Sequence, residues 1–541
     1  MASCGFPYYI GGVFDDRNQL LCTPAGVVRD PGFFFNAKGI KALVSTEVTS
    51  IDRKKKQVEY RNLNDGTVGT AEYDKLIITT GARPVMPPVP GVALKGITTL
   101  QSMRDADFLR QVHDENKIKH AVVVGGGLIG IETCEALNQA GIEITLVERL
   151  PQILNFLDRQ LAKLAESHAK ANGIEVITGN GVAEFIGKDD QLTAVRLEDG
   201  HEIPCELAII AIGVRPNSKL AADSGLEIGE LGGITVNEYM QTSDPDIYAA
   251  GDCVETLHRI TGKKVHAPFG DLANLQGRVA GQNVINGNKA KSPGTLLTGV
   301  CKLFEDVAGS TGLSEDSARK AGFDAVSLVI AGLDMPGFMG GLPLISKMVV
   351  DAKTQRILGF QCIGNGDASK RLAEAALAIQ GNLTVDDLVN ADLPYAPPFS
   401  LAIDHLIVCA QVMENKLTGR LKTITAEELK QKLDDGQKPV LLDNRSPEEF
   451  EMMRLDIGEQ LIPLGALRKR ISELPEDKDT EIICYCKISL RGYEAALILE
   501  AAGYRNVRVM EGGILAWPYP KFMAPVPVPV PQPAKEAVAV H

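Results

Sequence analysis

This sequence has few aromatic residues, no long apolar run and an excess of acidic over basic residues. The last two features argue against particular classes of partner. Aromatic residues make up 5% of the 541 residues, with a single tryptophan, Trp517. No run of eighteen apolar residues occurs, so no transmembrane helix is expected. Basic residues are outnumbered, 56 Lys and Arg against 69 Asp and Glu, and the net charge of −13 repels phosphate backbones. We therefore expect neither a membrane nor a nucleic acid as partner.

Paired cysteines are missing as well. The ten cysteines are scattered and none form a C-x-x-C pair, which argues against a metal site of the zinc type. Scattered thiols suit a reducing compartment and no secretory signal is visible, so we expect a cytoplasmic protein. Hydrophobic residues at 45% and 53 glycines indicate an ordinary globular composition. A chain of this length predicts three or four domains.

The region from 109 to 234 alternates strand and helix patterns. Apolar runs at 120–124 and 142–147 predict strands, and 131–140 predicts an amphipathic helix. Between the first strand and the helix, Gly125, Gly127 and Gly130 fit G-x-G-x-x-G. These glycines permit a tight turn, close approach of a pyrophosphate, and close helix–strand packing. The sequence therefore predicts a parallel α/β sheet with a dinucleotide site, to which we also assign Ile129 in the same turn.

An acidic residue ends the second predicted strand. Glu148 lies 23 residues beyond Gly125, where a carboxylate accepts hydrogen bonds from a ribose 2′-hydroxyl and repels a 2′-phosphate. This favours NADH over NADPH, although the adjacent Arg149 leaves NADPH open. The alternative is a glycine-rich turn without a ligand.

Two near-copies of one short strand–turn pattern flank this unit. They are Leu-Ile-Ile-Thr-Thr-Gly-Ala-Arg-Pro at 76–84 and Leu-Ala-Ile-Ile-Ala-Ile-Gly-Val-Arg-Pro at 207–216. A third apolar strand, at 247–250, ends on Gly251 and Asp252. Taken alone, Asp252 could simply cap a helix.

Together these residues resemble the two-dinucleotide flavoprotein disulfide reductases, over roughly residues 1–418. The resemblance implies FAD as a cofactor beside NADH or NADPH. It implies that Thr80, Gly81 and Gly213 join the two nucleotide domains and that Glu132 lies near the nicotinamide. Further residues along the flavin are implied to be Gly251, Asp252, Ala267 and Pro268.

The first residues resemble the single-cysteine branch of that family, which contains coenzyme A disulfide reductases, NADH peroxidases and NADH oxidases. The matching stretch is Ser-Cys-Gly-Phe-Pro-Tyr-Tyr-Ile-Gly-Gly at 3–12. The stretches 367–371 and 395–400 are similar to the interface domain of coenzyme A disulfide reductases. The resemblance implies that Ser3 and Lys38 contact coenzyme A. It also implies that Tyr395 reaches the partner's active site in a homodimer. At 334–337, Asp-Met-Pro-Gly replaces the Tyr-Tyr-Pro-Gly of the family, which leaves the thiol carrier open.

Physical chemistry supports a redox role for Cys4. Pro7 and the pair Gly11 and Gly12 predict a short helix with Cys4 at its N-terminus, where the helix dipole favours thiolate. No second cysteine lies within one helical turn. Cys4 is therefore expected to cycle through a mixed disulfide, a persulfide or a sulfenic acid. The alternative is an inert cysteine.

The family places an FAD-binding β-α-β unit, with its own G-x-G-x-x-G, before the redox cysteine. This sequence begins three residues before Cys4, so we expect a truncated first FAD segment. As written, the chain is expected to hold FAD weakly or not at all.

From 425 to 518 the chain resembles a rhodanese domain. Asp443 and Arg445 form the family's Asp-x-Arg at the end of a predicted strand at 440–445, and Cys486 begins a loop that ends at Arg491. Backbone N–H groups of such a loop stabilise a thiolate or persulfide, with Arg491 adding positive charge. Ser489 stands where the family usually has glycine. An inert rhodanese-like domain is the alternative.

We thus expect an α/β fold: two interleaved Rossmann-like domains, the first truncated, then an α+β dimerisation domain and a rhodanese-like domain. The expected boundaries are 1–108 and 235–295 for FAD, 109–234 for NAD(P)H, 296–418 for dimerisation, 425–518 for rhodanese, and 524–541 for a proline-rich tail.

The expected activity is NADH-dependent reduction of a coenzyme A disulfide, persulfide or polysulfide, with Cys486 carrying sulfane sulfur. Three alternatives remain open. They are an NADH peroxidase or oxidase acting through a Cys4 sulfenate, a sulfurtransferase only, and a non-catalytic docking protein.

Overall fold

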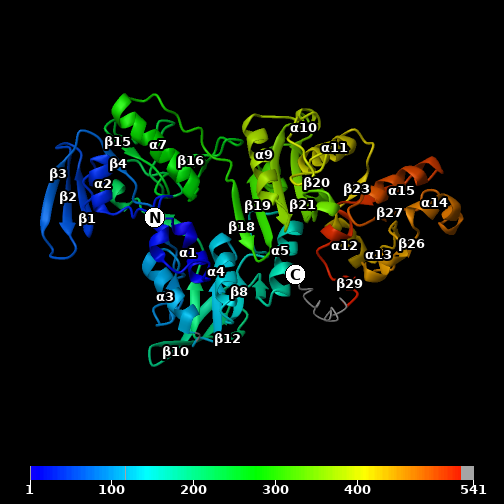
Figure 1. Ribbon diagram of the computed structural model, residues 1–541, viewed down its shortest axis with the longest axis horizontal. Coiled ribbons are helices and arrows are strands. Elements are labelled where there is room, and N and C mark those ends of the chain that lie inside the picture. Colours follow the sequence, from blue (N-terminus) through cyan, green and yellow to red (C-terminus); the bar gives the residue numbers. More distant parts are fainter. Residues whose placement is uncertain (1, 116, 526–541) are drawn as a thin grey trace, which may run out of the picture. The chain divides into compact units, whose positions relative to one another are not determined.

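The computed structural model describes residues 2–115 and 117–525 (Figure 1). The chain divides into two compact units. The first contains the chain up to Leu328 together with Gly332–Glu414, and the second contains Val329–Ala331 and the chain from Asn415 onward. From residue 526, the expected proline-rich tail lies outside the described residues.

A five-stranded parallel sheet forms the centre of the nucleotide region in the first unit, in the order β6-β13-β7-β8-β9. Its strands are β6 (Ile97–Thr99), β7 (His120–Val124), β8 (Glu143–Glu148), β9 (Glu175–Thr178) and β13 (Leu207–Ile210). Helices α4 (Leu128–Asn138) and α5 (Arg159–Ala171) pack on these strands, and α3 (Met103–Glu115) precedes β7. An antiparallel sheet of β10 (Val182–Lys188), β11 (Gln191–Leu197) and β12 (Glu202–Pro204) joins the same core. Burial on both faces explains the continuous apolar runs of β7 and β13.

Smaller sheets combine segments from before and after this region. β4 (Leu76–Ile78) pairs in parallel with β15 (Ile247–Ala249), and β5 (Ala82–Pro84) pairs antiparallel with β14 (Val214–Pro216). The two near-copied stretches of the sequence therefore pair with each other, with Arg83 opposite Arg215. Such interleaving confirms the expected fold class.

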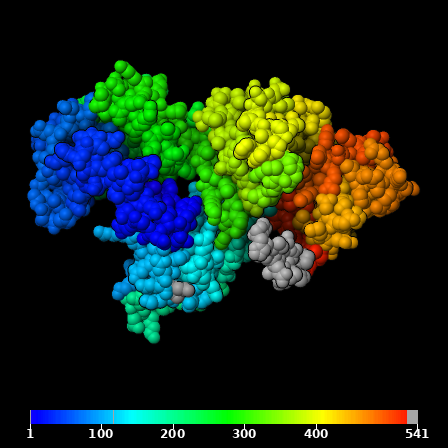
Figure 2. Space-filling model, in the orientation of Figure 1, coloured from blue at the N-terminus to red at the C-terminus, as the bar shows by residue number. Residues whose placement is uncertain are grey.

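The remaining elements of this region are short, except for the three strands β1–β3 and the long helix α7. The N-terminal residues, dark blue in Figure 2, form part of the surface of the first unit. The strands are β1 (Thr46–Asp52), β2 (Gln57–Asn62), β3 (Val68–Glu72), β16 (Thr256–Leu257) and β17 (Lys264–Val265). The helices are η1 (Ser3–Gly5), α1 (Phe6–Ile10), η2 (Arg17–Leu20), α2 (Pro31–Lys38), α6 (Lys219–Asp223) and α7 (Gly270–Asn286).

A second five-stranded sheet follows in the order β18-β19-β22-β21-β20, and β19 pairs antiparallel with β18 and β22, as β21 does with β22. Its strands are β18 (Gly299–Leu303), β19 (Asp306–Gly312), β20 (Ala325–Leu333), β21 (Pro343–Asp351) and β22 (Ile357–Gly364). Its helices are α8 (Glu315–Lys320), η3 (Gly337–Met339), α9 (Ala368–Gln380), α10 (Val385–Val389) and α11 (His405–Leu417). Arg371 on α9 is fully buried and pairs with Asp404 at 2.9 Å.

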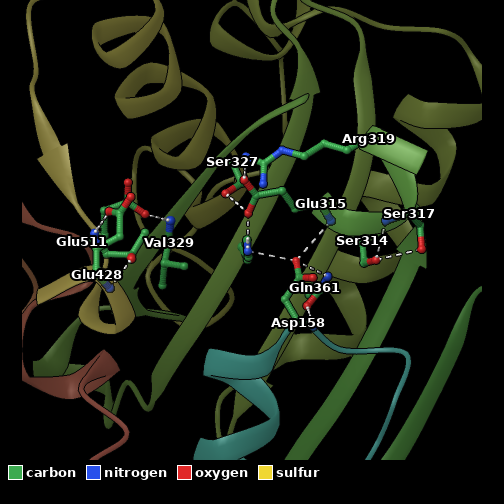
Figure 3. Close-up of polar contacts among 12 residues, drawn as sticks. Asp158, Ser314, Glu315, Ser317, Arg319, Ser327, Val329, Gln361, Glu428 and Glu511 are labelled. Carbon is green, nitrogen blue, oxygen red and sulfur yellow. Dashed lines mark hydrogen bonds and ion pairs between the residues drawn. The ribbon is translucent and has the colours of Figure 1, made fainter. Parts of the chain in front are cut away.

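A polar clamp joins α5 of the nucleotide region to this sheet (Figure 3). The backbone N–H of Asp158 donates to Gln361 Oε1 at 2.7 Å, and Gln361 Nε2 donates back to the Asp158 carboxylate at 3.0 Å. Lys347 Nζ lies 3.0 Å from Asp158 and 2.8 Å from Glu315. The clamp therefore fixes the N-terminus of α5 to β21 and β22.

The second unit is built on a five-stranded parallel sheet, in the order β23-β28-β27-β24-β26. Its strands are β23 (Thr423–Ile424), β24 (Val440–Asp443), β26 (Gln460–Leu461), β27 (Ile482–Tyr485) and β28 (Val507–Met510), with a separate pair β25 (Met453–Arg454) and β29 (Phe522–Met523). Its helices are α12 (Ala426–Asp434), α13 (Pro447–Met452), α14 (Leu464–Arg470), η4 (Ile471–Glu473), α15 (Leu490–Ala501) and η5 (Gly513–Ala516). The buried Glu511 carboxylate accepts from Val329 N–H at 2.8 Å and from Lys416 Nζ at 2.6 Å (Figure 3).

Element boundaries differ from the sequence expectations by a few residues. The helix expected at 131–140 begins at Leu128, inside the glycine motif, because glycine is tolerated in its first turn. The strand expected at 440–445 ends at Asp443, since Asn444 and Arg445 turn away to make side-chain contacts. Among the residues that the structure describes, no helix is long and apolar enough to cross a membrane and no group of metal-ligating side chains gathers.

Candidate active sites

The glycine turn after β7 has the geometry of a dinucleotide cradle. Gly125 has φ +109°, and a methyl group there would lie 2.4 Å from the carbonyl oxygen of Ala211. A methyl group on Gly130 would lie 1.9 Å from the Gly125 carbonyl oxygen. A methyl group on Gly127 would meet no atom within 4 Å, so this glycine faces open space at the N-terminus of α4. Ile129, in the first turn of α4, is 42% exposed. These residues fit a nicotinamide dinucleotide.

Glu148 closes the same turn from the end of β8. Its buried carboxylate accepts N–H bonds from Gly126 at 2.7 Å and Leu150 at 2.8 Å. Each carboxylate oxygen retains a further lone pair for a ribose hydroxyl. The exposed Arg149 is turned toward Glu198, at 3.3 Å.

The residues expected to join the two nucleotide domains lie beside the paired strands β5 and β14. Gly81 has φ +67° and Gly213 has φ +100°, and both face open space. The Thr80 hydroxyl donates to the Asn217 carbonyl at 2.6 Å, which fixes the turn between β4 and β5 to the end of β14.

The loop after β15 supplies the residues expected along the flavin. Gly251 has φ +81° and its N–H donates to the buried Gln276 of α7 at 2.9 Å. Burial raises the pKa of the Asp252 carboxyl. Ala267 is buried and Pro268 exposed, both just before α7 begins at Gly270. These residues fit part of an FAD site, and residues 2–115 contribute no glycine-rich phosphate turn to it.

Cys4 lies in η1, immediately before α1, as the sequence predicted, but its principal neighbour is a different helix. A methyl group on Gly270 would lie 3.8 Å from Cys4 Sγ, so the sulfur sits at the N-terminus of α7. The positive end of this helix dipole stabilises negative charge on that sulfur. Arg110 of α3 holds α1 in place by donating to the Tyr9 carbonyl at 2.8 Å and stacking on its ring.

A cluster of titratable groups lies near Cys4, with two glutamates on α4, Tyr8 on α1, and Cys301 and Lys302 on β18. Burial, then the nearby Glu135, raises the pKa of Glu132 to about 7. Burial, then Glu132 and Glu135, raises the pKa of Tyr8 to about 12, with smaller effects from Cys301 and Cys4. Glu135 is buried and ion-paired with Lys302, and it accepts the N–H of Phe304 at 2.7 Å. The nucleotide helix and the cysteine segment therefore meet at Glu132 and Tyr8.

Three predicted residues lie on the surface. Ser3 is exposed beside Cys4, and Lys38 is exposed at the end of α2. Tyr395, 53% exposed, follows α10 in the region that carries the second sheet. It lines a cavity of about 420 Å³ with Asp334, Lys370 and Phe399 among others.

The second unit holds Cys486 in a loop between β27 and α15. Its sulfur-bearing side chain is buried. The turn after β28 supports the loop, since Ile514 N–H donates to the Cys486 carbonyl at 3.0 Å and Leu515 N–H to the Lys487 carbonyl at 3.2 Å. A methyl group on Gly513 would lie 2.4 Å from that Cys486 carbonyl oxygen.

Ser489 explains how this loop departs from the glycine pattern. Its φ of +75° is left-handed, which favours glycine. Its hydroxyl donates to the Met510 carbonyl, which compensates for part of that strain. Arg491, in the first turn of α15, pairs with Glu449 at 2.6 Å and lies near Cys486, whose charge contributes to raising the pKa of Arg491.

Several contributors to the sites were not predicted from the sequence. Gly270 comes from a segment far from Cys4, whereas Tyr8 and Glu135 lie close in sequence to Cys4 and Glu132 but carried no signal of their own. Glu449 carried one local signal, because Ser-Pro-Glu-Glu at 446–449 is a helix-capping pattern. Nothing local indicated its pairing with Arg491.

Comparison with known proteins identifies the class. The pyridine nucleotide-disulphide oxidoreductase model matches residues 12–267, its dimerisation domain matches 301–407, and a rhodanese-like domain matches 425–518. The chain belongs to the pyridine nucleotide-disulphide oxidoreductases, a family that depends on FAD and NAD(P)H.

Within this family, the chain is similar to several proteins whose names refer to sulfur, persulfide or coenzyme A. The chain is 35% identical over 415 residues to the NAD(P)H sulfur oxidoreductase (CoA-dependent) of Pyrococcus abyssi, covering 76% of this chain and 90% of that protein. The structure of an NAD-dependent persulfide reductase from A. fulgidus superposes with TM-score 0.90 at 39% identity, covering 96% of this chain and 93% of that one. Reduced CoADR-RHD of Bacillus anthracis gives TM-score 0.87 at 33% identity, covering 95% and 90%.

Proposed function

We propose that this protein is an NAD(P)H-dependent flavoprotein that reduces a coenzyme A persulfide, disulfide or polysulfide, and that its rhodanese domain handles the sulfane sulfur. The observation that carries the proposal is the similarity to a persulfide reductase over 96% of the chain. That similarity extends over the reductase and rhodanese regions together, whereas an oxidase or peroxidase needs no second sulfur-handling domain.

The nucleotide turn binds the electron donor. Gly127 leaves room for the pyrophosphate at the N-terminus of α4, and Gly125 and Gly130 permit the tight turn. Glu148 accepts the adenosine ribose hydroxyls, which favours NADH. Glu132, with a pKa of about 7, lies near the nicotinamide and can hold or release a proton at neutral pH, and Ile129 covers the nucleotide.

FAD, when bound, links two-electron transfer from the nicotinamide to sulfur. The residues that would hold it are Thr80, Gly81, Gly213, Gly251, Asp252, Ala267 and Pro268. Their positions around β5–β14 and before α7 support this assignment, because the same helix α7 begins beside the Cys4 sulfur.

Cys4 is the catalytic nucleophile of the reductase. Its thiolate attacks the coenzyme A-bound sulfur of the persulfide, forming a Cys4–coenzyme A disulfide and releasing hydrosulfide. Two electrons then cleave this disulfide, so the net reaction converts persulfide, NADH and one proton into coenzyme A, hydrogen sulfide and NAD⁺. Ser3 and Lys38 contact coenzyme A.

Cys486 accepts or delivers the sulfane sulfur as a persulfide, and Arg491 stabilises its negative charge. We further propose a cytoplasmic homodimer in which Tyr395 completes the active site of the partner subunit. The dimerisation-domain match at 301–407 supports the homodimer.

The test follows NADH oxidation at 340 nm and sulfide release by the purified chain supplied with FAD and coenzyme A persulfide. Cys4→Ser is expected to abolish both signals while NADH still binds. Cys486→Ala is expected to abolish sulfur transfer from thiosulfate and to leave reduction of preformed coenzyme A persulfide intact. NADH oxidation driven only by peroxide or oxygen, with no sulfide released, would refute the proposal.

A further inference from the structure

Arg491 is held by Glu449 and lies near Cys486. Its Nη1 and Nη2 donate to the two carboxylate oxygens of Glu449 at 2.6 and 2.8 Å. The same guanidinium lies near enough to Cys486 for the charge of that sulfur to act on it. The bond to Glu449, and to a lesser degree Cys486, raises the pKa of Arg491 above its ordinary range. A bidentate pair of this kind fixes the plane of the guanidinium as well as its position.

Glu449 is itself anchored by its helix. It occupies the third position of α13, where its carboxylate accepts the Ser446 N–H at 3.1 Å while its own N–H donates to the Ser446 hydroxyl at 3.3 Å. The hydrogen bond from Arg491 lowers the pKa of Glu449 to about 2. The carboxylate is therefore charged at neutral pH and cannot move without uncapping α13.

Without the Glu449 carboxylate, few contacts would keep the Arg491 side chain near the Cys486 sulfur. Its side chain is 33% exposed, and a free guanidinium gains hydration and rotamer freedom by turning into water. Cys486, in contrast, is buried, with its loop pinned by the turn after β28. The geometry therefore depends on a residue 42 positions before Arg491 in the chain.

We propose that Glu449 is a positioning residue that holds the Arg491 guanidinium against Cys486, so that the site attracts anionic sulfur donors such as thiosulfate or a persulfide anion. This proposal rests on the proposed sulfur-handling role of Cys486. Glu449 contributes no contact to the reacting sulfur, and its own negative charge would by itself repel such donors.

The test uses the full-length chain and two alkylating probes of similar size, anionic iodoacetate and neutral iodoacetamide. Mass spectrometry of the Cys486 peptide gives the two rate constants, and their ratio reports the local electrostatic potential. Glu449→Gln and Arg491→Ala are each expected to lower the iodoacetate-to-iodoacetamide ratio about three- to tenfold, the effect of one unit charge about 4 Å away in a water-like dielectric. Glu449→Gln made in the Arg491→Ala chain should lower it no further.

Two control variants separate positioning from structure. Glu448→Gln removes the same charge from an exposed neighbour on α13 and is expected to leave the ratio unchanged. Ser446→Ala removes only the hydroxyl of the cap, while the backbone N–H at 446 still anchors the Glu449 carboxylate, so it is also expected to leave the ratio unchanged.

A ratio that rises in Glu449→Gln would overturn the proposal, because Glu449 would then act only as a repelling charge. An equal fall in Ser446→Ala would overturn it too, as would a wild-type Cys486 that neither probe can reach. The alkylation readout needs no turnover. If the alkylation ratio does not fall in Glu449→Gln although the wild type produces sulfide, the positioning role alone is refuted. If the ratio falls as expected but the wild type produces no sulfide, only the proposed function is refuted.

Discussion

Replacing Glu132 by Gln tests the cluster of titratable groups near Cys4. Burial and the neighbouring Glu135 raise the pKa of Glu132 from 4.5 to about 7. The folded protein therefore binds this proton more tightly than the unfolded chain does. The contribution of this proton to the free energy of unfolding of the wild type is fully present below pH 4.5 and is lost as the pH rises through 7. Glutamine has the shape of the neutral acid and carries no such ionisation cost.

The size of the effect follows from the shift. A difference of about 2.5 pKa units corresponds to about 3 kcal/mol at full ionisation. For a unit of about 400 residues, about 3 kcal/mol moves the melting temperature by roughly 3 °C. Glu132→Gln should thus melt above wild type by several degrees at pH 8.5, and the gap should nearly close at pH 5.

The assay is a thermal melt of each protein at half-unit pH steps, without nucleotide. Glu230→Gln, which removes an exposed carboxylate of the same unit, serves as the control and should track wild type throughout. A gap between Glu132→Gln and wild type that stays constant with pH, or that widens toward acid, would refute the reasoning. It would mean that Glu132 ionises in the fold as it does in water.

Three further predictions concern other parts of the chain. Gly127→Ala should keep wild-type stability within about 0.5 kcal/mol yet bind NADH at least tenfold more weakly by titration, because only the pyrophosphate needs that space. Gly130→Ala should lose stability and NADH binding together, because its methyl group would lie 1.9 Å from a carbonyl oxygen. Arg371→Met should cost about 3–5 kcal/mol in urea unfolding, since it leaves Asp404 buried with a weaker partner, and a cost below 1 kcal/mol would contradict this. Ser489→Gly should be about 1–2 kcal/mol more stable than Ser489→Ala in the same measurement, because both variants lose the hydroxyl bond but only alanine keeps the left-handed strain. Equal stabilities would show that the loop is unstrained.

Local patterns in the sequence predicted much of the fold. The strand at 120–124 matches β7, and the two near-copied stretches were recognisable before their pairing as β5 and β14 was known. These elements are predictable because a buried strand and a glycine turn constrain residues that are adjacent in the chain.

The environment of each sulfur was much less predictable. Gly270 approaches Cys4 across 266 positions, and Glu449 reaches Arg491 across 42. Such contacts depend on how whole elements pack, which residue spacing does not encode. The glycine missing at 489 could be seen in the sequence, but the hydroxyl bond to Met510 that compensates for it could not.

The clamp between Asp158 and Gln361 has a consequence for amide exchange. The first turn of a helix normally frays, since its N–H groups lack partners within the helix. Here the backbone N–H of Asp158, just before α5, donates to the side chain of Gln361 on β22. The Asp158 carboxylate is in turn bound to Lys347 on β21. Deuterium uptake at the Asp158 amide should therefore be slow and should accelerate only when the antiparallel sheet that contains β21 and β22 opens. This single amide thus reports on strands that lie some 200 residues further along the chain.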